Sequence, residues 1–257
     1  MQFYKYHGAG NDFILVDNRV ENITLSNEQI AHLCNRRLGI GADGLMLLEN
    51  TEGYHFKMVY YNSDGNESTM CGNGGRCITA FAKELGIITD AAEFLATGGV
   101  YVSTMHADGT IRLKMQDVKD IQLLESHAIL NTGSPHYIVW VDSVVDTDVY
   151  AKGNKIRNSE AFQPAGINVN FVQRISSNKL LVRTYERGVE DETLSCGTGV
   201  TAAAIAATGK ETGVFTTEVE TPGGHLKVNF TKDTPLSATN VMLTGPVVMV
   251  FKGEVAL

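Results

Sequence analysis

A cysteine followed by a glycine-rich turn occurs twice in this chain, and each copy opens a stretch typical of a helix. The first copy is CGNGG at 71–75 and the second is CGTG at 196–199. Glycine permits a tight turn and a close approach of ligand to backbone. The first turn of a helix presents N–H groups and a partial positive charge, which bind a carboxylate and favour a thiolate. The sequence therefore predicts two thiols, each at a helix N-terminus.

The flanks of the two cysteines repeat as well, which predicts two halves of like fold. The cysteines are 196 − 71 = 125 positions apart, near half of the 257 residues. A strand ending in Tyr, a polar turn with Gly, and then Glu and Thr precede each cysteine, over 61–69 and 185–193. A Gly-Gly pair before a strand follows at 98–99 and at 223–224. The second half begins near Gln116.

Many short strands and few helices favour an α/β (α+β) fold with mixed or antiparallel sheets over a doubly wound parallel sheet. One predicted helix begins after the N-cap Ser26 and runs to about Arg37. The segment 133–136 is predicted as a turn before a strand over 137–141. Cys34 and Cys77 are interpreted as core residues.

Composition and motifs exclude several classes of protein. A formal net charge of −8 argues against a nucleic-acid partner. The chain has no run of about 18 apolar residues, so no membrane partner is predicted. Four cysteines without a secretory signal favour a reducing, cytoplasmic location. Their spacing is not that of a zinc site, and no nucleotide fingerprint or pyridoxal phosphate lysine is evident, so neither a metal nor a cofactor is predicted.

Two matched thiols favour inversion of a stereocentre over covalent catalysis. A single nucleophilic cysteine would suffice for covalent catalysis, usually with a histidine partner. Two thiols can instead remove a proton from one face of a carbon and return a proton to the other face, which inverts the stereocentre. Helix N-termini would supply the oriented dipoles that stabilise the developing negative charge.

Local sequence leaves the roles of several polar residues open. Asn11 either binds a ligand or holds its own turn. Glu186 and Arg187 either form a surface ion pair or recognise the amine and carboxylate of a substrate. His136 is either a turn histidine or a residue that tunes a thiol.

Taken together, the motifs resemble the diaminopimelate epimerase family. The similar segments are 5–13, 62–65 with 70–77, and 186–188 with 192–199. The resemblance implies interconversion of LL- and meso-diaminopimelate without pyridoxal phosphate, in the route to lysine and peptidoglycan. It implies two similar domains, each a barrel-like sheet around a central helix, with the active site in the cleft between them. The implied domains are 1–115 plus about 246–257, and 116–245, in a homodimer.

The resemblance also implies residue roles. Cys71 and Cys196 would be the acid–base pair, with His136 and Glu186 close enough to tune the thiols. The implied substrate-binding residues are Asn11, Asn62, Gly72, Asn73, Asn168, Glu186, Arg187, Gly197 and Thr198. Two departures affect distal contacts: Gly44 stands where some members have Gln, and Ser134 stands where the family usually has Asn.

Three alternatives remain at this stage. A proline racemase-like enzyme also uses paired cysteines in a similar fold, and a PhzF-like isomerase is a weaker rival without that pair. From another class, the chain would be a non-catalytic redox-switch or ligand-binding protein in which Cys71 and Cys196 form a reversible disulfide.

Overall fold

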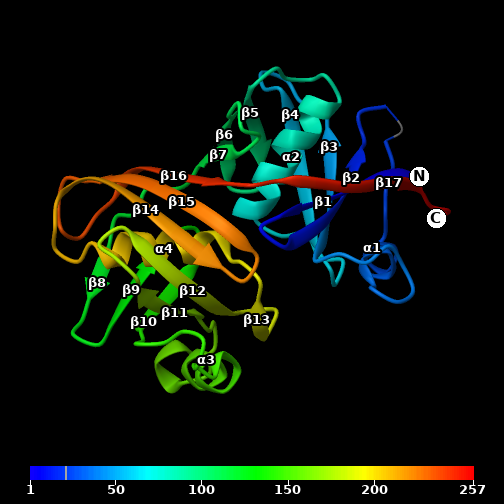
Figure 1. Ribbon diagram of the computed structural model, residues 1–257. Coiled ribbons are helices and arrows are strands. Elements are labelled where there is room, and N and C mark those ends of the chain that lie inside the picture. Colours follow the sequence, from blue (N-terminus) through cyan, green and yellow to red (C-terminus); the bar gives the residue numbers. More distant parts are fainter. Residues whose placement is uncertain (21) are drawn as a thin grey trace. The chain divides into compact units, whose positions relative to one another are not determined.

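The computed structural model describes residues 1–20 and 22–257, which divide into two compact units. One unit comprises Met1–Leu113 with Gly245–Leu257, and the other comprises Lys114–Thr244. Strands dominate both units, and one long buried helix lies in each (Figure 1). The prediction of a sheet-rich mixed α/β fold built from two similar halves is confirmed.

The first unit is one mixed sheet with two helices. Its ladder order is β17–β1–β2–β3–β4–β5–β6–β7, with parallel pairing at β2–β3 and β4–β5 and antiparallel pairing elsewhere. The elements are β1 (Gln2–Gly8), β2 (Asn11–Asp17), α1 (Asn27–Cys34), β3 (Gly44–Glu49), β4 (Phe56–Asn62), α2 (Gly72–Glu84), β5 (Ala91–Ala96), β6 (Gly99–Met105), β7 (Ile111–Lys114) and β17 (Val248–Glu254).

The second unit repeats this plan. Its ladder order is β8–β9–β10–β11–β12–β14–β15–β16, and β13 pairs with the end of β12. The elements are β8 (Ile121–Leu123), β9 (His127–Asn131), β10 (Pro135–Trp140), α3 (Val149–Arg157), the 3-10 turn η1 (Glu160–Phe162), β11 (Asn168–Arg174), β12 (Lys179–Glu186), β13 (Asp191–Thr193), α4 (Gly197–Ala207), β14 (Gly213–Thr221), β15 (Gly224–Lys232) and β16 (Thr239–Gly245).

The two units share one order of strand directions. From β1 to β7 the successive pairings are antiparallel, parallel, antiparallel, parallel, antiparallel and antiparallel. From β9 to β16 the same six pairings occur in the same order. Each cysteine turn follows the middle antiparallel pair, so the internal sequence repeat corresponds to a repeat of the fold.

The central helices are α2 and α4, and each is buried over most of its length. Gly72–Thr79 of α2 is buried throughout, and α2 packs against β1, β2, β3 and β6. In α4 only Thr198 is not fully buried, since an alanine-rich helix without a polar face belongs in a core. Both helices end before a glycine in the left-handed region, Gly86 and Gly209, as helix C-termini prefer.

Two boundary predictions were wrong. The N-cap at Ser26 is confirmed by a capping box with Gln29, but α1 ends at Cys34 and does not reach Arg37. The Asn35 side-chain oxygen accepts the N–H groups of Arg37 and Leu38, and this local turn competes with the helix. The strand predicted from Tyr137 starts at Pro135, so His136 is not a turn residue: it pairs with Leu130 and Asn168 on either side.

Candidate active site

The first thiol lies where the sequence predicts it, at the N-terminus of a central helix. Cys71 is the N-cap residue of α2 with an extended backbone, and its side chain is half-buried. The first main-chain bond of the helix runs from Gly75 N to Cys71 O, at 2.7 Å. The Cys71 Sγ lies 3.5 Å from Asn11 Oδ1, to which a protonated thiol donates. The N-terminal turn at Asn11 and the first CGNGG motif therefore meet.

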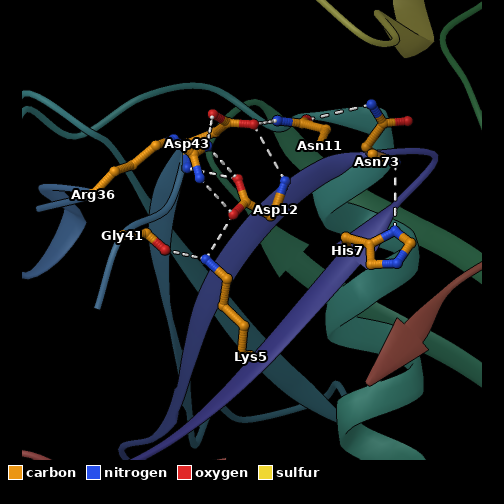
Figure 2. Close-up of polar contacts among 9 residues, drawn as sticks. Lys5, His7, Asn11, Asp12, Arg36, Gly41, Asp43 and Asn73 are labelled. Carbon is orange, nitrogen blue, oxygen red and sulfur yellow. Dashed lines mark hydrogen bonds and ion pairs between the residues drawn. The ribbon is translucent and has the colours of Figure 1, made fainter. Parts of the chain in front are cut away.

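The Asn11 side chain is held by partners on both of its polar atoms. Its Nδ2 donates to Asp43 Oδ2 at 2.6 Å, and its Oδ1 accepts from Asn73 Nδ2 at 3.3 Å (Figure 2). Asp43 Oδ2 also accepts from the Asp12 backbone N–H at 3.2 Å. Asn11 is thus held by Asp43 and Asn73 and contacts the thiol, while its role in binding a ligand stays a prediction.

Two carboxylates beside Asn11 are held by cations. Asp12 pairs with Lys5 at 2.7 Å and with Arg36 at 2.7 Å, and Arg36 reaches Asp43 at the same distance (Figure 2). Burial would raise the pKa of Asp12, but hydrogen bonds from Arg36 and Lys5 outweigh it and lower that pKa to about 2. Lys5 also donates to the Gly41 carbonyl.

A buried arginine lies beneath the first thiol turn. Arg76 has no exposed surface, and it donates to Asn73 Oδ1 at 2.8 Å and to Gly72 O at 3.3 Å. Its Nε has no hydrogen-bond partner among the residues that the structure describes. Burial lowers the pKa of Arg76 to about 10, which leaves the guanidinium charged near neutral pH. A Cβ at Gly8 would lie 3.1 Å from the Asn73 carbonyl oxygen, so this glycine allows β1 to pass close to the backbone of α2.

The second thiol has a different set of partners. Cys196 is the N-cap residue of α4, and its Sγ lies 3.4 Å from Thr198 Oγ1. Thr198 Oγ1 is 2.9 Å from His136 Nε2, and His136 Nδ1 is 3.0 Å from Asn170 Nδ2. The Asn170 amide donates to Nδ1, so Nε2 carries the ring proton and donates to Thr198. The threonine hydroxyl can then donate to the sulfur of Cys196.

The orientation of Asn170 follows from its other partner. Thr184 Oγ1 donates to Asn170 Oδ1 at 2.9 Å, which turns the amide nitrogen toward His136. Both Asn170 and His136 are fully buried. Burial lowers the pKa of His136 to about 3, and the nearby positive charge of Arg187 adds to that effect. His136 is therefore neutral at physiological pH and acts in the hydrogen-bond chain as an uncharged donor.

Stability should depend on pH through His136. An unfolded histidine has a pKa of about 6.5, above the folded value of about 3, so the unfolded chain binds an extra proton between these values. Stability is then complete above about pH 6.5 and falls toward pH 3, by up to about 1.4 kcal/mol per pH unit. Urea unfolding of wild type and His136→Gln over this range should show a steeper loss for wild type. Parallel curves would contradict the neutral, buried histidine.

The end of β12 and the start of β11 bring three predicted binding residues together. The backbone N–H of Arg187 donates to Asn168 Oδ1 at 2.8 Å, and Asn168 Nδ2 donates to Ser134 Oγ at 3.0 Å. Ser134 thus reaches Asn168, the neighbouring residue on β11. Glu186 Oε2 accepts from Thr193 Oγ1 at 3.0 Å. Arg187 Nη1 donates to the Ala165 carbonyl at 3.2 Å.

The surroundings of Gly44 leave no room for a side chain at this position. A Cβ at Gly44 would overlap the ring of Tyr60 and the carbonyl of Tyr61, so a Gln cannot be placed there without moving β4. The buried Tyr60 ring, which packs edge-on against Phe13, fills that space. Asn62 pairs with Gly44 at the exposed end of β4.

The other two cysteines are core residues, as predicted. Cys34 and Cys77 are buried, and burial raises the pKa of Cys34 to about 11 and the pKa of Cys77 still further. No cysteine among residues 1–20 and 22–257 is in a disulfide. In the same ranges no cluster of three His, Cys, Asp or Glu side chains could hold a metal ion. None of the helices there is long and apolar enough to cross a membrane.

Sequence reasoning missed four residues of these networks: Arg76, Asp43, Asn170 and Thr184. Arg76 had a usable signal, because it stands five positions after Cys71, where Thr201 stands after Cys196. The hydroxyl of Thr201 donates to Gly197 O at 2.9 Å, as the Arg76 guanidinium does to Gly72 O. A charged residue at a buried helix position is unusual and could have been singled out.

Comparison with known proteins identifies relatives over nearly the whole chain. The family model described as diaminopimelate epimerase matches residues 3–121 and 128–250. A diaminopimelate epimerase from Flavobacterium psychrophilum is 50% identical over 255 residues, which cover 98% of this chain and 99% of the relative. The enzyme of that name from Chlorobaculum tepidum is 40% identical over 259 residues, covering 97% and 99%.

Solved structures with low sequence identity show the same fold. A phenazine biosynthesis protein of the PhzF family from Bacillus anthracis aligns with a TM-score of 0.75 at 17% identity, covering 100% of this chain and 99% of the other. A probable proline racemase from Agrobacterium radiobacter aligns with a TM-score of 0.70, also at 17% identity, covering 100% and 93%. At this identity the likeness shows the fold alone.

Proposed function

This chain belongs to the diaminopimelate epimerase family, and from that premise we propose that it is an isomerase that interconverts LL- and meso-2,6-diaminopimelate without a cofactor. In a cell this reaction supplies precursors of lysine and peptidoglycan. One observation carries the two-thiol mechanism: Cys71 and Cys196 occupy the same position in two repeated units, as N-cap residues of α2 and α4.

In the proposed reaction one cysteine acts as a thiolate and the other as a thiol. The thiolate takes the α-proton, so that its S–H bond forms as the C–H bond breaks, and the electron pair stays on the α-carbon and its carboxylate. The opposite thiol then donates its proton to the other face and becomes the thiolate. The reverse direction exchanges the two roles, and no external oxidant or cofactor is needed.

The barrier to removing an α-proton is lowered by charge stabilisation. Helix N-termini carry N–H groups and a partial positive charge that favour a carboxylate and its enolate-like form. We assign this role to the first turns of α2 and α4, with Gly72, Asn73, Gly197 and Thr198 as donors. Asn11, Asn62, Asn168, Glu186 and Arg187 are proposed to hold the rest of the substrate, and Glu186 and His136 to tune the thiols.

Proton NMR of LL-diaminopimelate with reduced protein in deuterated buffer tests the reaction and the substrate together. The α-proton signal should disappear while the meso isomer forms, because the returned proton comes from solvent through the thiol. Absence of exchange by a folded, reduced protein would contradict the proposal. Proline would then be the next substrate, because the fold is shared with a probable proline racemase.

The proposal includes a cytoplasmic homodimer. An apolar strip on β17 supports self-association, since four consecutive residues, Val248–Phe251, are each at least 42% exposed. Light scattering after size exclusion should give twice the chain mass of 27.9 kDa. Val250→Lys should shift the measured mass toward that of the monomer, while the circular dichroism spectrum remains that of the folded protein. A wild-type monomer at all concentrations would exclude the dimer.

A further inference from the structure

We propose that Asp43 is a positioning residue for Cys71: together with Arg76 it fixes the Asn11 side-chain amide with its oxygen facing the thiol. The proposal rests on the assigned role of Cys71 in proton transfer. Asp43 does not contact the thiol itself, and it acts through Asn11.

At one end of the chain of hydrogen bonds, Asp43 fixes which way the Asn11 amide faces. A carboxylate can only accept hydrogen bonds, so the atom of Asn11 that faces Asp43 Oδ2 at 2.6 Å must be the amide nitrogen. The amide oxygen of Asn11 then faces Cys71 Sγ and Asn73 Nδ2. The opposite orientation would place a carbonyl oxygen against a carboxylate.

At the other end of the chain of hydrogen bonds, Arg76 independently requires the same orientation of the Asn11 amide. A guanidinium can only donate, so the Asn73 atom at 2.8 Å from Arg76 Nη2 must be its oxygen. The Asn73 nitrogen is then directed to Asn11 Oδ1 at 3.3 Å. Every bond from Arg76 through Asn73 and Asn11 to Asp43 therefore runs in one direction, from a cation to an anion.

Asp43 is itself held in place by neighbouring charges. Arg36 Nη2 donates to Asp43 Oδ1 at 2.7 Å, and Arg36 is anchored in turn by Asp12, which pairs with the buried Lys5 (Figure 2). The backbone N–H of Asp12 reaches Asp43 Oδ2 at 3.2 Å. This support comes from β1, from β2 and from the turn after α1, so the Asn11 amide is positioned by a rigid frame.

The fixed polarity gives the two thiols different environments. Asn11 Oδ1 can accept a hydrogen bond from Cys71 but cannot donate one, so this contact favours the protonated thiol. Thr198 Oγ1, which receives the His136 proton, can donate to Cys196 and so favours a thiolate there. These hydrogen bonds thereby favour Cys71 as the protonated member of the thiol pair, and they orient its proton.

Three substitutions at Asp43 separate the orientation of the Asn11 amide from the charge at position 43. Asp43→Asn loses the negative charge and the acceptor that faces Arg36, but it keeps a carbonyl oxygen that can accept from Asn11, whereas Asp43→Ala loses all three. The Asp43 side chain is 42% exposed, so either variant should fold, and Asp43→Ser, whose hydroxyl is too short to replace the carboxylate, serves as a second loss variant. Asp17→Ala is the matched control, because Asp17 pairs with Arg19 in the same unit, at the opposite end of β2 from Asn11.

The first readout is alkylation of each cysteine by iodoacetamide across pH, followed by peptide mass spectrometry. In Asp43→Ala and Asp43→Ser, Cys71 should react roughly two- to tenfold faster near neutral pH, the change expected for loss of one hydrogen bond to the thiol form. Asp43→Asn and Asp17→Ala should match wild type, and Cys196 should be unchanged in all four. Equal effects of Asp43→Asn and Asp43→Ala would show a charge effect and overturn the proposal, as would no effect of Asp43→Ala.

The second readout is epimerisation of diaminopimelate. We expect kcat/KM to fall roughly 10- to 100-fold in Asp43→Ala, because a misplaced acid–base group loses its alignment with the reacting atom, and to remain near wild type in Asp43→Asn. Alkylation needs no substrate, so the positioning of Cys71 can be tested even if wild type does not act on diaminopimelate. Failure of the proposed function and failure of this inference are therefore distinguishable.

Discussion

Cys71→Ala and Cys196→Ala are each expected to lower the rate of epimerisation by roughly 10²- to 10⁴-fold or more, the contribution of a positioned acid or base. In the proposed mechanism each thiol serves one face of the substrate, so neither should replace the other. The double variant should be little worse than either single variant, since the two groups act as a unit. Exchange of the α-proton without inversion can persist in a single variant through the remaining thiol.

The measurement is conversion of LL- to meso-diaminopimelate by NMR, with circular dichroism to confirm folding. Cys34→Ala is the matched control, because Cys34 lies in the hydrophobic core of the first unit, in a cluster with Ile30 and Leu33. It should lose some stability and keep its turnover. Appreciable epimerisation by Cys71→Ala would be incompatible with the two-thiol mechanism, whereas loss of turnover in folded Cys34→Ala would show that the effect is not specific to the thiol pair.

Gly199→Ala should damage the protein much more than Gly74→Ala, although both glycines stand three positions after a thiol. A Cβ at Gly199 would overlap Asn170 Oδ1, and Asn170 cannot move without breaking its bonds to His136 and Thr184. The overlap should cost about 1–3 kcal/mol of folding stability, as overpacking does. The substitution should also lower turnover, because it displaces the hydrogen bonds that link His136 to Thr198 and Thr198 to Cys196.

At Gly74 the overlapping atom is the terminal methyl of Met46, which can rotate away. Alanine also favours a helix over glycine by about 1 kcal/mol, which offsets the remaining strain. Gly74→Ala should therefore unfold in urea within about 1 kcal/mol of wild type. Equal loss of stability in the two variants would show that Asn170 is not held as firmly as its hydrogen bonds indicate.

The sequence by itself determined the features that depend on a few neighbouring residues. Glycine turns that lead into helices placed Cys71 and Cys196 as N-caps, and the capping residue Ser26 marked the start of α1. The recurring spacing around the cysteines also determined that the fold is repeated, because each half carries its own turn, helix and strand signals. These signals are local, so they can be read without knowledge of the tertiary structure.

The tertiary structure decided which distant residues meet. His136 and Thr198 are 62 positions apart, and Asn11 and Asp43 are 32 apart, so their contacts depend on strand order and register. The parallel pairing of β10 with β11 places His136 beside Asn168, and it turned a predicted turn histidine into a buried donor. The end of α1 is a different case, because it depends on a local signal. The turn formed by the Asn35 side chain ends the helix, although the neighbouring residues favour a longer one.

The direction of the hydrogen bonds around each thiol is also evident only from the tertiary structure. The sequence contains Arg76, Asp43 and Asn170 without indicating their partners, because a hydrogen-bond direction depends on which groups share a buried space. The Tyr60 ring beside Gly44 is a similar case, since only packing reveals that the space of a longer side chain is already filled. Local sequence thus determined which thiols are candidates for the reaction, and long-range packing decided which groups surround each of them.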